Sequence, residues 1–151
     1  RPTTDPTISD LLIAAGADPE ERSVNRMEPP VPIFSVTDVP KALGYYIERL
    51  GFASMFTWDD PPTFATVARD EARIFLSAGR ESGQAPGSWI SIFLPDVDAL
   101  HREYVERGAL IVTPPEDYPW GVREMRVQDP DGNVIRMGTG NEDVRNDDDH
   151  D

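Results

Sequence analysis

The segment Val36-Thr-Asp-Val-Pro-Lys-Ala-Leu-Gly-Tyr-Tyr-Ile-Glu-Arg-Leu-Gly51 returns, with one gap, as Leu94-Pro-Asp-Val-Asp-Ala-Leu-His-Arg-Glu-Tyr-Val-Glu-Arg-Gly108. The two copies agree at acidic, aromatic, basic and glycine positions: Asp38 with Asp96, Tyr46 with Tyr104, Arg49 with Arg107 and Gly51 with Gly108. Agreement over this length indicates one supersecondary unit that is used twice. Two units around a shared sheet leave a cleft between them, and we expect a functional site in that cleft.

Each copy belongs to a predicted βαβββ unit. In the first unit the pattern predicts a strand at 31–36, a helix at 39–50 and strands at 53–58, 64–69 and 72–77. In the second unit it predicts a strand at 88–94, a helix at 97–107 and strands at 110–112, 123–128 and 134–137. A loop rich in proline and acidic residues is expected between residues 112 and 123. Elements in this order predict an α+β protein.

Apolar residues at helical spacing predict the inward faces of the two helices: Leu43, Tyr46, Ile47 and Leu50 in the first, and Leu100, Tyr104 and Val105 in the second. Asp129-Pro-Asp-Gly-Asn133 predicts a tight turn before the last strand. In this turn Pro130 presets its own φ, and Gly132 or Asn133 can adopt a positive φ.

The repeated part is expected to form one domain at residues 31–138, with modules at 31–80 and 88–138. Before it, residues 7–15 predict a short helix that ends at Gly16, and residues 18–30 read as a linker. After it, residues 139–151 are expected to be a disordered acidic tail.

Composition excludes several classes of function. The chain has 151 residues and a formal net charge of −14, which repels nucleic acid and favours a cationic small molecule. It has no cysteine and only two histidines, so thiolate sites are impossible and histidine-rich metal sites are nearly excluded. There is no apolar run of membrane-spanning length and no basic leader, which predicts a soluble, cytoplasmic protein.

Four features together resemble the vicinal oxygen chelate superfamily, which includes glyoxalase I, extradiol dioxygenases and bleomycin resistance proteins. They are the paired βαβββ units, Asp-Val ahead of Ala-Leu at the start of each helix, Arg-Leu-Gly-Phe at 49–52 and the turn at 129–133. The resemblance covers residues 31–138 and implies two modules that form a curved mixed sheet.

Enzymes of that superfamily hold a divalent metal with ligands from the first and last strand of each module. Carried onto this sequence, the ligand positions fall on Val31, Trp89 and Arg136, and near Phe75 or Leu76. None of these side chains offers a lone pair to a divalent cation. The resemblance therefore implies a member without metal or cofactor, unless shifted carboxylates such as Glu124 rebuild a site.

Aromatic residues stand where chelating relatives would be charged. Strand alternation places Trp89, Ser91 and Phe93 on one face of the second module's first strand, matching Val31 and its alternate neighbours in the first module. The alternative is that Trp89 and Phe93 fill a core. The full set of candidate ligand-binding residues is Phe56, Trp58, Asp59, Asp60, Phe64, Trp89, Ser91, Phe93, Tyr118, Trp120 and Arg136. Flat aromatic walls beside carboxylates suit a planar cation.

Within the superfamily the pattern is most similar to bleomycin resistance proteins, which are metal-free, acidic dimers that sequester a cationic glycopeptide. The resemblance rests on Phe56, on Ser88-Trp89 and on Trp120-Gly121 ahead of the 129–133 turn. It implies a homodimer that binds a planar cationic or amphipathic antibiotic and confers resistance. The alternatives are an enzyme of the same fold, a lyase, isomerase or dioxygenase, and a purely structural or regulatory module.

The polar candidates leave two points open. His101, between charged neighbours on the second helix, favours a surface role over a catalytic one. Arg136 is expected either to pair with a carboxylate across the groove or to meet an anionic ligand. Glu124 and Arg126 share one face of their strand, and the sequence leaves open whether that face points inward or outward.

Overall fold

The computed structural model describes residues 24–79 and 87–140. The chain divides into two compact units, residues 1–30 and residues 31–151. The expected helix at 7–15, the connection around residue 83 and the acidic tail after residue 140 lie outside the described residues. No helix of the described part is long and apolar enough to span a membrane.

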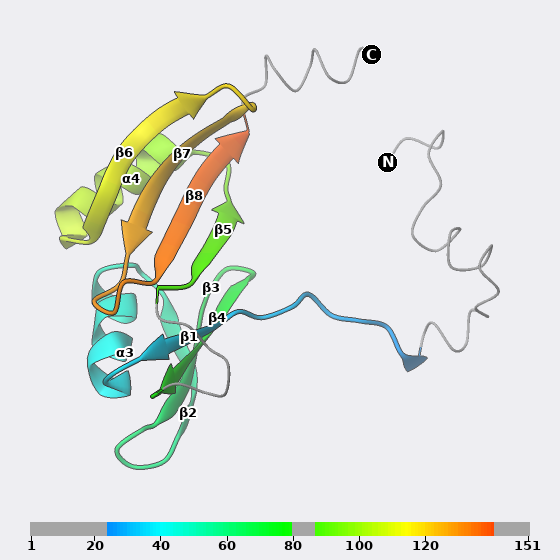
Figure 1. Cartoon of the computed structure of the whole chain (residues 1–151), viewed down its shortest axis with the longest axis vertical. Helices are drawn as coiled ribbons and strands as arrows, with labels where there is room; N and C mark the ends of the chain where they lie inside the picture. The colour runs from blue at the N-terminus through cyan, green and yellow to red at the C-terminus, as the bar shows by residue number, and fades with distance from the viewer. Residues whose placement is uncertain (1–23, 80–86, 141–151) are drawn as a thin grey trace. The chain divides into compact units, whose positions relative to one another are not determined.

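The second unit contains two βαβββ modules (Figure 1). Module 1 consists of β1 (Ile33–Val36), α3 (Val39–Glu48), β2 (Ala53–Trp58), β3 (Phe64–Arg69) and β4 (Ala72–Ala78). Module 2 consists of β5 (Trp89–Phe93), α4 (Val97–Arg107), β6 (Leu110–Tyr118), β7 (Val122–Gln128) and β8 (Val134–Gly140). The α+β class and the module plan are confirmed.

Each module forms its own mixed sheet of four strands. Sheet 1 has the order β1-β4-β3-β2, and sheet 2 has the equivalent order β5-β8-β7-β6. The first and last strands of each module pair in parallel, and the other pairs are antiparallel. One helix packs on one face of each sheet, and the buried core lies on these helix-covered faces.

The prediction of a loop after residue 112 is wrong, because β6 continues to Tyr118. Pro114 and Pro115 lie within this strand. The strand is at the edge of sheet 2, where a missing backbone N–H costs no ladder hydrogen bond. Its register with β7 shifts between Ile111 and Thr113 and again between Thr113 and Glu116, which accommodates the prolines.

Both helices begin at the aspartate that the repeat predicts. Asp38 accepts a hydrogen bond from the backbone N–H of Lys41 at 3.0 Å, and Asp96 accepts one from Ala99 at 3.1 Å. These side-chain caps satisfy an N–H group that has no partner within the helix. The second helix ends at Gly108, whose φ of 76° is the left-handed conformation that glycine adopts without strain.

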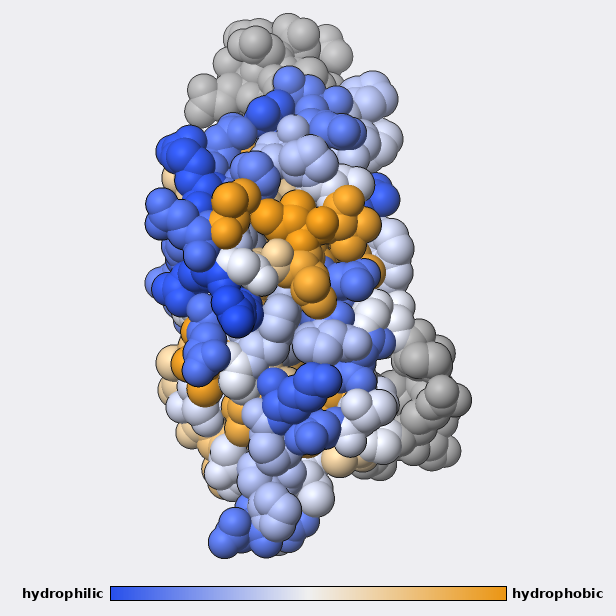
Figure 2. Space-filling model, turned by 90° about the vertical axis from the view of Figure 1, so that its left-hand side faces the viewer, coloured by the Kyte–Doolittle hydropathy of each residue, from blue (hydrophilic) through white to orange (hydrophobic). Residues whose placement is uncertain are grey.

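The inward faces are narrower than predicted. Tyr46, Leu50 and Tyr104 are fully buried as predicted. Ile47 and Val105, which hold the same position in the two copies of the repeat, are instead 40 % and 58 % exposed. They lie one position beyond the buried tyrosines and fall off the stripe that faces the sheet. Figure 2, which views the side where α3, α4 and β6 lie in Figure 1, shows a hydrophobic patch bordered by hydrophilic residues.

Equivalent residues of the two helices join the modules. The Arg49 guanidinium donates to the carbonyl of Arg107 at 2.7 Å, and Arg107 donates back to the carbonyl of Glu48 at 2.9 Å. The buried Tyr104 hydroxyl donates to the carbonyl of Leu50 at 2.8 Å. The repeat therefore also supplies the contacts that hold the modules against each other.

The 129–133 turn adds a buried carboxylate to these contacts between the modules. Asp129 accepts hydrogen bonds from the Tyr46 hydroxyl at 3.0 Å, from the backbone of Asp131 and from the backbone and side chain of Asn133. Burial raises the pKa of Asp129, while these donors act to lower it. The turn motif thus has a structural role, which is to anchor module 2 to α3.

Candidate ligand-binding faces

The side of sheet 1 that faces away from α3 carries aromatic side chains, and we call it face 1. It consists of Ile33, Phe56, Trp58, Phe64 and Phe75. Trp58 lies directly opposite Phe64, and Ile33 directly opposite Phe75, so each pair projects to one side. The rings of Phe64 and Phe75 meet edge to face, with centroids 5.3 Å apart. Trp58 is 63 % exposed, so face 1 presents a large apolar surface.

In the acidic turn beside face 1, one of the two carboxylates is used in a hydrogen bond within the turn. Asp59 has a φ of 73°, and its carboxylate accepts a hydrogen bond from the Thr63 hydroxyl at 2.6 Å. Asp59 and Asp60 are both exposed and follow Trp58 directly in the chain. The turn therefore places negative charge at the end of the aromatic surface.

The corresponding side of sheet 2, which we call face 2, combines aromatic and charged residues: Trp89, Ser91 and Phe93 of β5, Tyr118 of β6, Trp120 of the following turn, Glu124 and Arg126 of β7, and Arg136 of β8. Trp89 and Phe93 are 56 % and 68 % exposed. The alternative that they fill a core is therefore wrong for the described chain. Tyr118 and Trp120 stack at 4.8 Å with an interplanar angle of 17°.

A buried carboxylate lies at the centre of face 2. Glu124 is 3 % exposed, and Arg136 donates to both of its oxygens at 2.9 and 2.8 Å. Arg126 makes a longer contact to the same carboxylate at 3.4 Å. The hydrogen bonds from Arg136 hold the pKa of Glu124 below its usual range, so the carboxylate stays ionised. Arg136 thus pairs with a carboxylate, as in the first of its two predicted arrangements, but this carboxylate lies on the neighbouring strand β7 and not across the groove.

Arg126 lies among the aromatic rings of face 2. Its guanidinium carbon is 5.3 Å from the centroid of Trp89 and 6.0 Å from that of Tyr118. Both distances fall within the range of cation–π attraction. Arg126 and Glu124 belong to the open side of the sheet because the alternate residues Met125 and Val127 are fully buried. This settles the orientation that the sequence left open.

The residues at the superfamily's metal positions do not fit a divalent cation. Val31 and Trp89 provide no donor atom, and Arg136 is a cation. Glu124 is already engaged by two guanidinium groups. No group of three or more His, Asp or Glu side chains that suits a metal ion occurs among residues 24–79 and 87–140.

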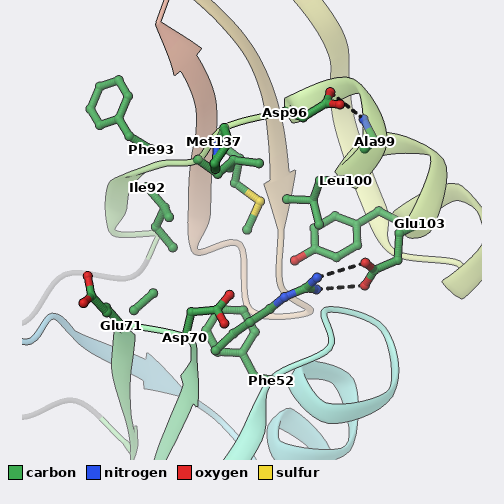
Figure 3. Close-up of a pocket in the computed structure, with 15 residues that line it drawn as sticks. Phe52, Asp70, Glu71, Ile92, Phe93, Asp96, Ala99, Leu100, Glu103 and Met137 are labelled. Atoms are coloured by element: carbon green, nitrogen blue, oxygen red, sulfur yellow. Dashed lines mark hydrogen bonds and ion pairs between the residues drawn. The ribbon is translucent and has the colours of Figure 1, made fainter.

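A cavity of about 630 Å³ lies where the two modules meet (Figure 3). The Arg69 guanidinium crosses it to Glu103 with two hydrogen bonds of 2.8 and 2.9 Å, and Asp96 is occupied as the cap of α4. Of the candidate residues only Phe93 lines it. A second cavity of about 630 Å³ brings Phe93 and Trp120 together.

The candidate residues therefore form two groups on two sheets. Phe56, Trp58 and Phe64 share face 1, with Asp59 and Asp60 at its end, while the other six share face 2. Neither cavity described above is lined by members of both groups. The candidate set omitted Phe75 and Arg126, and it also omitted Ile33, which strand alternation had already placed on the same face as Val31. Their positions one residue away from buried strand residues, such as Ile74 and Leu76 on either side of Phe75, were the available signal.

Comparison with known proteins agrees with this architecture. Residues 29–137 match the model of the Glyoxalase/Bleomycin resistance protein/Dioxygenase superfamily. A bleomycin resistance protein of Geobacillus stearothermophilus is 28 % identical over 123 residues, covering 70 % of this chain and 91 % of that protein.

Two solved structures are also similar. The bleomycin-binding protein of bleomycin-producing Streptomyces verticillus, complexed with copper(II)-bleomycin, is 29 % identical with a TM-score of 0.64, covering 76 % of this chain and 98 % of that one. The antibiotic binding protein TnmS3 of Streptomyces sp. CB03234 is 27 % identical with a TM-score of 0.61, covering 77 % and 99 %. The chain belongs to the Glyoxalase/Bleomycin resistance protein/Dioxygenase superfamily.

Proposed function

We propose that this protein binds a planar cationic or amphipathic natural product of the bleomycin type and confers resistance by sequestering it. The observation that carries the proposal is the pair of open sheet faces, which expose Phe56, Trp58, Trp89, Phe93 and Trp120 to solvent. Exposed apolar patches of this kind mark binding sites rather than monomer surfaces. The relatives that bind or resist bleomycin support the choice of ligand class.

The binding groove is proposed to lie between two copies of the chain. Face 1 offers aromatic rings with an acidic turn at one end, and face 2 offers aromatic rings around an ion cluster. A homodimer that sets face 1 of one chain against face 2 of its partner would enclose a flat ligand between two aromatic walls. Each offset-stacked aromatic contact contributes about 1 kcal/mol beyond the apolar area that it buries. Asp59 and Asp60 would receive a cationic tail.

Titration with copper-loaded bleomycin tests the proposal. Trp58, Trp89 and Trp120 are the three tryptophans of the chain, and all three are exposed, so ligand stacking should quench the intrinsic fluorescence. We expect saturable quenching at micromolar drug or below, and recovery of intact drug after the protein is denatured. Absence of quenching at micromolar drug would remove the proposal.

Metal analysis of the purified protein separates sequestration from catalysis. A stoichiometric divalent ion in the purified protein would favour an enzyme of the same superfamily. Altered drug recovered from the complex would also favour an enzyme. The proposal places the protein in the cytoplasm, where a sequestering protein would intercept a drug before it reaches its target.

A further inference from the structure

We infer that Arg126 makes face 2 selective for planar ligands that carry an anionic group at the edge of the ring system. The inference rests on the proposed function in one respect, namely that a flat ligand stacks on face 2. It adds a chemical requirement for that ligand, which the acidic composition of the chain does not suggest.

Arg126 uses little of its hydrogen-bonding capacity within the described chain. Its Nε makes the 3.4 Å contact to Glu124, and its two terminal nitrogens make no hydrogen bond to any residue in the described ranges. The side chain is 28 % exposed. A guanidinium is always charged and carries five N–H donors, so most of its donor capacity remains to be used.

Glu124 has a full partner in Arg136 and does not need Arg126. Arg136 already occupies both carboxylate oxygens in the bidentate arrangement that is the strong form of this pair. The three side chains together carry a net charge of +1. That surplus lies on a partly buried sheet surface, where an ion pair is worth more than in water.

Arg126 lies beside the aromatic surface on which a ligand would stack. Its guanidinium carbon is 5.3 Å from the centroid of Trp89 and 6.0 Å from that of Tyr118, so its N–H donors lie next to both rings. A ligand that stacks on Trp89 or on the Tyr118–Trp120 pair would bring an edge substituent to these donors.

One neighbouring acid competes for Arg126. Glu116 lies opposite Glu124 on β6, but it is exposed and accepts a hydrogen bond from the Tyr118 hydroxyl at 3.3 Å. It forms no ion pair with Arg126 within 4.0 Å. Its field is screened by water, so it weakens anion binding without abolishing it.

Three pyrene derivatives that differ in charge test the inference: pyrene-1-carboxylate, 1-pyrenemethanol and 1-pyrenemethylammonium. Each is titrated into the full chain at neutral pH, with pyrene and tryptophan fluorescence as the signals. We expect the carboxylate to bind tightest. Arg126→Gln should lower carboxylate affinity about tenfold, which is the loss of one charge-assisted contact, and leave the alcohol within about twofold.

The matched control is Arg102→Gln, which removes the same charge from the exposed side of α4. It should leave all three affinities unchanged. Glu116→Gln should tighten the carboxylate about twofold, because it removes the competing acid. Circular dichroism of each variant verifies that the fold is retained.

The inference is overturned if the ammonium binds as tightly as the carboxylate, if Arg126→Gln weakens carboxylate and alcohol equally, or if no pyrene derivative binds. The bleomycin titration is judged separately. Quenching by bleomycin without a carboxylate preference would leave the proposed function standing and sink only the inference. A carboxylate preference without bleomycin quenching would support the inference about Arg126 and contradict the proposed function.

Discussion

The Phe64–Phe75 pair of face 1 and the Glu124–Arg136 pair of face 2 hold equivalent positions in the two modules. In each pair the last-strand residue lies opposite the residue two positions beyond its partner on the preceding strand. Module 1 fills these positions with two rings in edge-to-face contact, and module 2 fills them with a bidentate ion pair. The same backbone thus carries two unrelated surface chemistries.

The comparison shows which part of the repeat is constrained. The helix-covered sides keep the same tyrosine, Tyr46 and Tyr104, because both are fully buried between the modules. The open sides are free to diverge because they contribute little to the core. The ligand-binding chemistry is therefore expected where the two modules differ.

The largest expected effect comes from breaking the pair on face 2. Glu124→Leu leaves two guanidinium groups without their carboxylate, and should lower the free energy of unfolding by about 3 kcal/mol. The equivalent change on face 1, Phe64→Leu, removes one half-buried ring contact and should cost about 1 kcal/mol. Urea denaturation of both variants measures the difference. Equal losses in the free energy of unfolding would mean that breaking the ion pair destabilises the fold no more than removing the aromatic contact does.

The conserved side of the repeat gives the next prediction. Tyr46→Phe removes a hydrogen bond to the buried Asp129 carboxylate and should cost about 2 kcal/mol, as for bonds to charged groups. Tyr104→Phe removes one to a backbone carbonyl and should cost about 1 kcal/mol. Thermal and urea unfolding rank the two variants. The reverse order would show that Asp129 is satisfied without Tyr46.

Replacing both partners tests whether face 2 needs its charges for folding. The double variant Glu124→Leu/Arg136→Leu gives module 2 an apolar pair, as module 1 already has, and should be within about 1 kcal/mol of the wild type. The single variant Arg136→Leu serves as the comparison. A double variant that is as unstable as Glu124→Leu would mean that the cluster is part of the fold rather than of the ligand surface.

The smallest effect is in the pH dependence. The pKa of Glu124 is lowered in the folded state, so its contribution to stability is present above the unfolded pKa of about 4.3 and is lost as the pH falls through the folded value. The stability gap between wild type and Glu124→Gln should therefore shrink between about pH 5 and pH 3. The exposed Glu106→Gln on α4 corrects for the loss of one carboxyl. A gap that does not change with pH would contradict the pairing.

The fold could be predicted from the sequence because the repeat, the helix caps and the tight turn are local signals. Both helices begin directly after the aspartates that the repeat aligns, Asp38 and Asp96. The length of β6 could not be predicted, because only its position at the sheet edge makes Pro114 and Pro115 tolerable. The aromatic candidates were identifiable by strand alternation. The unused hydrogen-bonding capacity of Arg126 could not be predicted, because it depends on Arg136 reaching the same carboxylate from another strand.

The central claim is that face 1 of one chain and face 2 of another form a single site. Trp58→Leu removes a wall of face 1 and Trp89→Leu a wall of face 2, so each homodimer should bind copper-loaded bleomycin at least about tenfold more weakly than the wild type. Unfolding and refolding the two variants together produces heterodimers, which contain one groove with both tryptophans intact. Calorimetric titration of this mixture should recover high-affinity sites at about a quarter of the wild-type number, since about half of the dimers are mixed. A mixture that binds no better than the separate variants would contradict the shared groove.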